Sequence, residues 1–300
     1  MNSDLITGSI NGYQLVLNAF LSRRAPQTQR CYRQRLKLFF KWASAMELTS
    51  INQINHLVVE QYINSLENKN LSYNTINTSL APVKKFFEYL YLADLIPSNS
   101  IKMVRPYKID RRAQKTKCPS KREIQKTLQQ INTKTIIGER DFLIILIFVN
   151  TGIRRQELRD LKIVDIKKNT IMINGKGQRK RNISISNSLK HEILKYINNN
   201  RARGNLYIFN SYRNNTPRGT LTSDSISRIL RSYAINAKVN LTPHMLRVYF
   251  ATEHYKKGTP ISVIQRLMGH ETINQTQRYI ELIEDEEISK KYITNEFLNQ

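Results

Sequence analysis

Apolar residues recur at helical spacing through the N-terminal third of this chain. They form four runs between Gly12 and Pro97, separated by polar or turn-forming residues. Each run keeps the i, i+3, i+4 spacing of an amphipathic helix. The runs extend over Leu15–Leu21, Tyr32–Ala43, Leu57–Leu66 and Ile76–Leu90. We therefore predict an N-terminal domain of four helices over residues 1–105.

The rest of the pattern predicts further helices and a small sheet. Ile163–Ile166, Thr170–Ile173 and Asn182–Ile185 are short runs of β-type residues, and they fit a three-stranded antiparallel sheet. Helical spacing occupies residues 120–131, 139–150, 188–199, 222–236, 242–257, 260–268, 272–280 and 285–298. The predicted fold class is mainly α, with a mixed α/β C-terminal domain over residues 120–300.

Residues 106–119 lack such a period and are predicted to be a basic linker between the two domains. Pro106 and Pro119 bracket the segment, and residues 107–122 hold seven basic side chains against one acidic side chain.

Charge makes nucleic acid the first partner to consider. The chain has 48 Lys and Arg against 23 Asp and Glu, and its formal charge of +25 favours polyanions. A membrane surface and a basic protein without a partner are the weaker alternatives. The basic side chains that we expect to contact DNA phosphates are Arg30, Arg33, Lys37, Lys84, Lys85, Arg111, Arg112, Arg179, Lys180 and Arg181.

Other classes of site find little support in the sequence. Cys31 and Cys118 are far apart and fit neither a zinc site nor a disulfide framework. The longest apolar run, Phe142–Val149, is far shorter than the roughly 20 residues of a membrane span. We expect a cytoplasmic, nucleoid-associated protein with no metal and no membrane contact.

A set of polar residues in the C-terminal domain supplies the chemical groups that cleavage of a phosphodiester requires. The residues are Arg154, Glu157, Lys176, His244, Arg247, His270 and Tyr279. Taken singly, each has an ordinary explanation: an ion pair, a hairpin lysine, a solvated helix face or a packed tyrosine. Metal-free chemistry on a phosphodiester needs fixed cations, a proton donor or acceptor and a nucleophile, and the set supplies all three.

These motifs resemble the tyrosine recombinase family, the phage-integrase and Xer-type enzymes. The matching segments keep the family's order and spacing and are Thr151–Leu158, Gly175–Gly177, His244–Arg247, Leu267–His270 and Tyr279. The resemblance covers residues 10–295 and implies a SAM-like core-binding domain and a catalytic domain that close around duplex DNA.

The resemblance implies how the phosphate is held. Arg154 and Arg247 would clamp the scissile phosphate, and His270 would hydrogen-bond it. Glu157 would orient the site. Arg155 is a rival for the first arginine, but the family register places that arginine two residues after a glycine, which is Gly152 here.

The resemblance also implies a nucleophile and two groups that move protons. Tyr279 would attack the phosphorus and form a 3′-phosphotyrosyl link. His244 would assist proton transfer at the nucleophile, and Lys176 would protonate the 5′-hydroxyl leaving group. Because the link preserves the bond energy, resealing would require no ATP and no cofactor.

The implied function is site-specific recombination of double-stranded DNA by a homotetramer, through a Holliday junction. The helix after Tyr279 would dock on a neighbouring protomer, with packing on its own domain as the alternative. The implied task is integration and excision of a mobile element or resolution of replicon dimers. A type IB topoisomerase and a DNA-binding protein that has lost catalysis are the competing functions.

Overall fold

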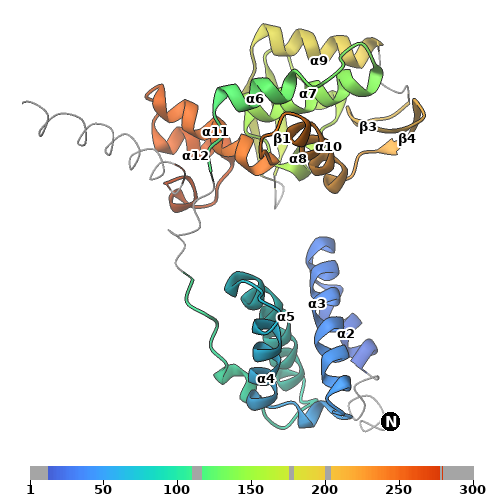
Figure 1. Cartoon of the computed structure of the whole chain (residues 1–300), viewed down its shortest axis with the longest axis vertical. Helices are drawn as coiled ribbons and strands as arrows, with labels where there is room; N and C mark the ends of the chain where they lie inside the picture. The colour runs from blue at the N-terminus through green and yellow to red at the C-terminus, as the bar shows by residue number, and fades with distance from the viewer. Residues whose placement is uncertain (1–12, 110–116, 176–178, 200–203, 278, 280–300) are drawn as a thin grey trace, which may run out of the picture. The chain divides into compact units, whose positions relative to one another are not determined.

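The chain divides into two compact units, residues 1–113 and 114–300. The computed structural model describes residues 13–109, 117–175, 179–199, 204–277 and 279 (Figure 1). Arg111, Arg112, Lys176 and the helix predicted near residues 285–298 lie outside the described residues. Among the described helices, none has the length and apolar character that crossing a membrane requires.

The first unit contains the four predicted α-helices. They are α2 (Tyr13–Ser22), α3 (Pro26–Ala45), α4 (His56–Glu67) and α5 (Tyr73–Leu92), with the 3₁₀ turns η2 (Ile51–Gln53) and η3 (Ser100–Met103). The helix starts follow local chemistry. Pro26 begins α3 at a position where its missing N–H costs nothing, and the Ser72 hydroxyl accepts the N–H of Thr75 at 3.3 Å to cap α5.

Aromatic side chains from α3 and α5 fill the core of this unit. Phe39, Phe40, Phe86 and Phe87 are all buried, and their rings meet mostly edge to face. Burial of each such side chain stabilises the unit by about 1.5–3 kcal/mol. The apolar periodicity of the sequence therefore predicted the helices and most of the residues that they bury, although Leu57, the first residue of the third run, is 60% exposed.

Tyr107, near the start of the predicted linker, is packed on the first unit. Its ring stacks on Tyr73 with centroids 4.4 Å apart, and its hydroxyl donates to Oε1 of Glu67 at 2.6 Å. The backbone N–H of Tyr107 donates to Oδ1 of Asn77 at 2.9 Å. Lys84, a partly buried residue of α5, donates to the Val104 carbonyl at 2.5 Å. Residues 104–107 thus form a strap across α4 and α5.

The second unit is built around the apolar helix α7. Its helices are α6 (Lys121–Leu128), α7 (Ile136–Thr151), α8 (Arg155–Arg159), α9 (Asn187–Asn199), α10 (Ser223–Asn236), α11 (Pro243–Lys256) and α12 (Ile261–Met268). Residues 273–277 and 279 are also helical. Most side chains of α7 are buried, and the helix packs against α9, α10 and α11 (Figure 1).

The predicted three-stranded sheet is a two-stranded hairpin. Strands β1 (Thr170–Asn174) and β2 (Lys180–Ser184) pair antiparallel, with Ile171 opposite Ile183. The prediction of a strand over Ile163–Ile166 was wrong. Residues 163–165 form the 3₁₀ turn η4, and Ile166 contributes an isolated bridge to Ile171. The Asp165 carboxylate accepts the N–H of Lys162 at 2.9 Å, and this local bond competes with strand pairing.

A second hairpin was not predicted. Strands β3 (Asn210–Arg213) and β4 (Thr216–Thr220) pair antiparallel, with Arg213 opposite Thr216. The turn between them consists of Asn214 and Asn215, both at positive φ, which is the conformation of a two-residue hairpin loop. Adjacent asparagines were the available signal, and Pro217 and Gly219 obscured the strand that follows them.

Candidate active site

A left-handed turn at Gly152 places Arg154 at the start of α8. Gly152 ends α7 with φ of +56°, and a Cβ there would lie 2.5 Å from a ring carbon of Phe250, so the turn requires glycine. Arg154 follows as the N-cap residue of α8. Its side chain is 38% exposed, and its guanidinium donates to the Gly269 carbonyl at 2.6 Å. Part of this cation therefore faces solvent while the rest is fixed.

Glu157 is a buried carboxylate held between two arginines. It accepts the backbone N–H and Nη1 of Arg154 at 2.8 and 2.9 Å, and Nη1 and Nη2 of Arg181 at 2.9 and 2.7 Å. Burial alone would raise the pKa of Glu157, but the hydrogen bonds and charges of Arg181 and then of Arg154 lower it to about 2. Glu157 is therefore ionised at neutral pH and orients both guanidinium groups.

Helix α11 supplies the second arginine and the first histidine. The Thr242 hydroxyl accepts the N–H of Met245 at 3.2 Å, and Pro243 occupies the first turn. Arg247 is 4% exposed and donates to the carbonyls of Gly152 and Met268, at the C-terminal ends of α7 and α12. Helix C-termini carry partial negative charge, which favours a buried cation.

Arg247 remains a cation at neutral pH in spite of its burial. Burial, followed by the nearby charge of Arg154, lowers the pKa of Arg247 to about 9. Burial of the His244 ring, followed by the charge of Arg247, lowers the pKa of His244. At neutral pH the site therefore contains a protonated arginine beside a neutral histidine.

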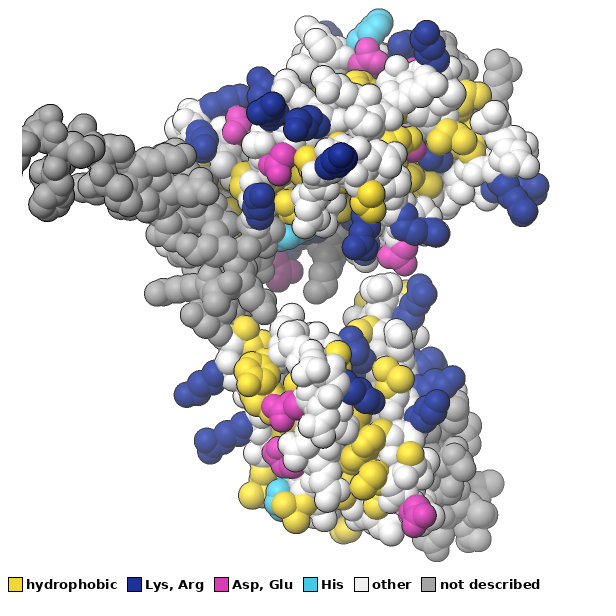
Figure 2. Space-filling view, in the orientation of Figure 1, with side chains coloured by type: hydrophobic (Ala, Val, Ile, Leu, Met, Phe, Trp, Pro, Cys, Tyr) yellow, Lys and Arg dark blue, Asp and Glu magenta, His cyan; other side chains and the backbone are white. Residues whose placement is uncertain are grey.

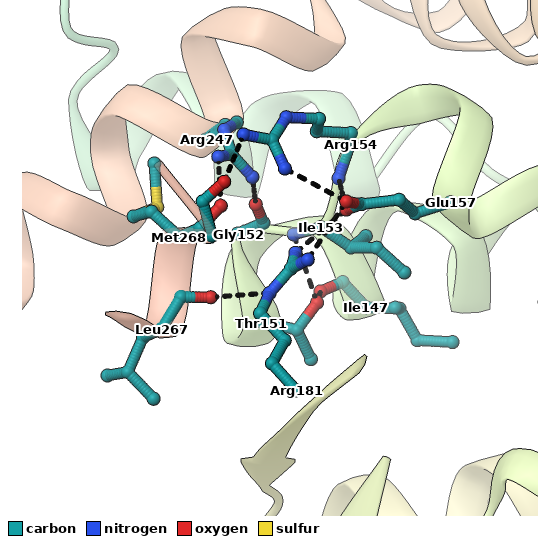
Figure 3. Close-up of polar contacts among 11 residues, drawn as sticks. Ile147, Thr151, Gly152, Ile153, Arg154, Glu157, Arg181, Arg247, Leu267 and Met268 are labelled. Carbon is teal, nitrogen blue, oxygen red and sulfur yellow. Dashed lines mark hydrogen bonds and ion pairs between the residues drawn. The ribbon is translucent and has the colours of Figure 1, made fainter. Parts of the chain in front are cut away.

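Three consecutive carbonyls at the end of α12 each accept a hydrogen bond from a different arginine. Arg181 donates to Leu267 at 2.8 Å, Arg247 to Met268, and Arg154 to Gly269 at 2.6 Å. Figure 3 shows Arg181, Arg154 and Arg247 converging on this segment from three different elements. These carbonyls have no partner within the helix, so the arginines satisfy them and fix the residue that follows.

His270 is that residue, and it is neutral. Gly269 turns the chain at φ of +60°, and Nδ1 of His270 then lies 2.8 Å from Oγ1 of Thr276, whose side chain is fully buried. Burial, followed by the charges of Arg247 and Arg154, lowers the pKa of His270 to about 3. A neutral imidazole has one N–H donor, and the Thr276 hydroxyl can either accept from Nδ1 or donate to it, so the contact is compatible with both tautomers.

Tyr279 lies next to both histidines of its own chain. Its ring centroid is 5.8 Å from that of His244 and 5.6 Å from that of His270. The half-buried ring also packs against the small cluster formed by Phe250, Ala251, Ile264 and Met268. The structure thus brings together every predicted site residue that it describes: Arg154, Glu157, His244, Arg247, His270 and Tyr279.

The basic residues that we expect to contact DNA differ in their surroundings. Arg30, Lys37, Arg179 and Lys180 are exposed. Arg33 donates to Oδ1 of Asn18 at 3.0 Å, and Lys85 pairs with Glu88 at 2.8 Å, both at the surface. Lys84 is bonded to the Val104 carbonyl within the first unit. Figure 2 shows more Lys and Arg than Asp and Glu on the face that it draws.

Arg181 and Thr276 are the site residues that sequence reasoning did not place. Arg181 was grouped with the DNA-contact residues, but its side chain is 9% exposed and its guanidinium donates to Glu157 and to the Leu267 carbonyl. The signal was the period of two in β2, because Arg181 falls on the same face as the buried Ile183. No sequence feature marked Thr276.

The site combines fixed cations, neutral imidazoles and a phenol. Within the described residues, no group of three or more His, Cys, Asp or Glu could hold a metal ion. Guanidinium groups carry five N–H donors and suit the oxygens of a phosphate. A neutral imidazole can accept a proton from a phenol. These parts fit nucleophilic attack by tyrosine on a phosphodiester.

Comparisons with known proteins agree with this arrangement. The model of the Phage integrase family matches residues 120–286, and that of the Phage integrase, N-terminal SAM-like domain matches residues 11–94. Tyrosine recombinase XerA of Pyrococcus horikoshii is 31% identical over 256 residues, which cover 75% of this chain and 89% of the relative. Tyrosine recombinase XerC of Oceanobacillus iheyensis is 24% identical over 298 residues, which cover 92% and 94%.

Solved structures share the fold. The XerH site-specific recombinase bound to palindromic difH substrate in a post-cleavage complex has a TM-score of 0.71 at 21% identity, covering 94% of this chain and 84% of that chain. A lambda integrase tetramer bound to a Holliday junction has a TM-score of 0.70 at 17% identity, covering 91% and 77%.

Proposed function

This chain belongs to the phage integrase family of tyrosine recombinases, enzymes that cleave and rejoin DNA in site-specific recombination, and we propose that Tyr279 is its nucleophile. The observation that carries the proposal is the position of the Tyr279 ring, 5.8 Å from the ring of His244 and 5.6 Å from that of His270 in the same chain. The buried cation Arg247 lies in the same cluster.

Cleavage is an exchange of one P–O bond for another. The Tyr279 oxygen attacks the phosphorus, the bond from phosphorus to the 5′-oxygen breaks, and a 3′-phosphotyrosyl link forms beside a free 5′-hydroxyl. His244, neutral at pH 7, takes the phenolic proton, and Lys176 gives a proton to the leaving oxygen. Reversal of these steps on a new 5′-hydroxyl rejoins the strand without ATP.

The phosphate is held by donors on three sides. Arg154 and Arg247 bind its non-bridging oxygens, where negative charge develops during attack, and Glu157 keeps the guanidinium of Arg154 in place. His270 donates through Nε2, and in this tautomer Nδ1 accepts a hydrogen bond from the Thr276 hydroxyl at 2.8 Å. This chemistry is proposed to need no metal or cofactor.

We propose double-stranded DNA as the substrate and a homotetramer on two paired sites as the active assembly. The shared fold with a lambda integrase tetramer on a Holliday junction supports this proposal. Residues 1–105 serve as the core-binding domain, residues 106–119 as the linker, and the helix near residues 285–298 docks on a neighbouring protomer. The proposed task is integration and excision of a mobile element or resolution of replicon dimers, at the nucleoid in the cytoplasm.

The test uses DNA that the protein itself selects. The Tyr279→Phe variant is used to capture duplexes from a randomised pool, and the captured duplex is then nicked at successive positions so that cleavage releases a short fragment. Wild-type protein is expected to form a covalent adduct that survives detergent, in the presence of EDTA. The Phe variant is expected to bind the same duplex and form no adduct.

Each alternative outcome identifies a different error. An adduct from Tyr279→Phe would show that another residue is the nucleophile, and loss of the wild-type adduct in EDTA would show that a metal takes part. Relaxation of supercoils by dilute protein without a selected site would favour a type IB topoisomerase. Binding without any adduct would favour a DNA-binding protein without catalysis.

The docking of the tail is tested by truncation before residue 284. If the tail docks on a neighbour, the truncated chain binds a single site normally and loses cooperative binding to paired sites. Unchanged cooperativity would place the tail on its own domain.

A further inference from the structure

Arg181 is an arginine whose side chain is largely buried. It lies in β2 opposite Ile173 of β1, and it shares the buried face of the strand with Ile183. Its side chain is 9% exposed. Its neighbours Arg179 and Lys180 are exposed. Of these three consecutive basic residues, Arg181 is therefore the one with a largely buried side chain.

The guanidinium of Arg181 bridges the two segments that present Arg154 and His270. Nη1 and Nη2 make a bidentate pair with Glu157 at 2.9 and 2.7 Å, and Glu157 also binds Arg154. Nε donates to the Leu267 carbonyl at 2.8 Å, three residues before His270. A planar guanidinium fixes such a geometry in a way that a lysine ammonium does not.

The packing at Gly269 shows how closely these parts fit. A Cβ on Gly269 would lie 2.9 Å from Nη1 of Arg181 and 3.3 Å from Nη1 of Arg154. The backbone just before His270 thus lies directly against both guanidinium groups. A displacement of Arg181 would be transmitted to α12 and to Glu157 together.

The charge of Arg181 also helps to keep Glu157 ionised. The chain places three guanidinium groups, those of Arg154, Arg181 and Arg247, around the single carboxylate of Glu157. Arg181 makes the largest favourable contribution to keeping that carboxylate ionised. Without Arg181, burial would act on Glu157 with less opposition, and the restraint on Arg154 would weaken.

We propose that Arg181 is a positioning residue for strand cleavage, which holds Glu157 and Arg154 in register with the end of α12 that presents His270. The proposal rests on the function proposed above, because it concerns the rate of the same cleavage step. Arg181 does not touch the phosphate in this scheme. It acts through the residues that do, so its loss is expected to slow cleavage at saturating DNA and to leave DNA affinity nearly unchanged.

The test measures affinity and the single-turnover rate constant separately, on the nicked duplex selected by Tyr279→Phe. Arg181→Met is expected to lower the rate constant on the order of 100-fold, because a displacement of catalytic groups by about 1 Å has an effect of that size. Arg181→Lys keeps the charge and loses the bidentate bond, and is expected to recover part of the rate. The Kd of each variant for DNA should stay within about threefold of wild type, because Arg181 acts on the cleavage step and does not contact the DNA.

Further measurements separate positioning from loss of folded protein. The final amount of adduct per mole of protein reports the active fraction, and a variant that merely misfolds lowers this amount without changing the rate constant. Arg266→Met is the matched control, because it removes the same charge from an exposed position on α12. The double variant Arg181→Met/Glu157→Gln should be no slower than the slower single variant, because both substitutions break the same contact between Arg181 and Glu157.

Three results would overturn the proposal. They are a rate constant for Arg181→Met equal to that of wild type, a loss confined to DNA affinity, and a loss confined to the active fraction with Arg181→Lys at the wild-type rate. Absence of any adduct from the wild-type chain would instead overturn the proposed function and this inference with it.

Discussion

Replacement of Glu157 by glutamine is expected to destabilise the second unit by about 3 kcal/mol at pH 7. Glu157 is 8% exposed and accepts four hydrogen bonds from Arg154 and Arg181. Its pKa falls from 4.5 to about 2 on folding, which corresponds to roughly 3 kcal/mol of stability. Removal of one partner from a buried ion pair costs a similar amount, about 3–5 kcal/mol.

The destabilisation is expected to depend on pH in a defined direction. Because the folded-state pKa is lowered, the stability that Glu157 contributes is present above about pH 4.5 and is lost as pH falls towards 2. The difference between wild type and Glu157→Gln should therefore be constant at neutral pH. It should shrink steadily as pH falls through this window.

Urea unfolding of the full chain provides the assay, with two spectroscopic signals. Far-ultraviolet circular dichroism follows the helices of both units, while fluorescence follows Trp42, the only tryptophan, which is partly buried and packs against the core of the first unit. Glu157→Gln should lower the midpoint of the second unit's transition and leave the Trp42 transition in place. Asp160→Asn is the control, since its pair with Arg159 is exposed and contributes less than about 1 kcal/mol.

Two results would show that Glu157 does not stabilise the second unit in this way. If Glu157→Gln unfolds at the wild-type urea concentration at pH 7, the buried pair does not stabilise the unit. If the difference between the two proteins persists unchanged at pH 3, ionisation of Glu157 is not its source.

Three further predictions concern neighbouring contacts. Thr276→Val should slow cleavage about tenfold, as loss of one hydrogen bond of about 1.4 kcal/mol does, while Thr276→Ser should keep the rate; equal rates would contradict the contact with His270. His270→Gln should reduce the loss of stability measured by urea unfolding as pH falls from 6.5 towards 3, because the folded-state pKa of His270, about 3, lies below its ordinary value of 6.5. An unchanged pH dependence would show that His270 is not buried in its neutral form. Tyr107→Phe should destabilise the first unit by about 1 kcal/mol and shift the Trp42 transition alone, and no shift would show that the bond to Glu67 contributes nothing.

Much of the fold followed from local features of the sequence. The helices of the first unit lie where the apolar periodicity of the sequence predicts them, and α3 begins at Pro26. The capping box of Ser120 and Glu123 started α6, and Thr242 with Pro243 started α11. These signals act within a few residues, so a sequence displays them directly.

The errors arose where a tertiary or side-chain contact outweighed the pattern. Residues 163–166 have the composition of a strand, but Asp165 bonds to the backbone and makes a turn. Arg181 looked like part of an exposed basic run, and only its distant partners Glu157 and Leu267 show otherwise. Partners this far apart in the chain leave no local mark.

The candidate site shows the same division. Spacing and resemblance singled out Arg154, His244, Arg247, His270 and Tyr279 as a set. They gave no indication that the carbonyls of residues 267–269 are each held by a different arginine. Nor did they show that Tyr279 lies beside the histidines of its own chain, which depends on how the last described helical segment packs.

The link between Tyr279 and DNA is tested by mass spectrometry of the trapped adduct. After nuclease and protease digestion, we expect one modified peptide, with nucleotide joined to Tyr279 through a 3′-phosphate, and a released strand that ends in a 5′-hydroxyl. A nucleotide on any other residue, or a link through a 5′-phosphate, would show that the proposed mechanism is wrong.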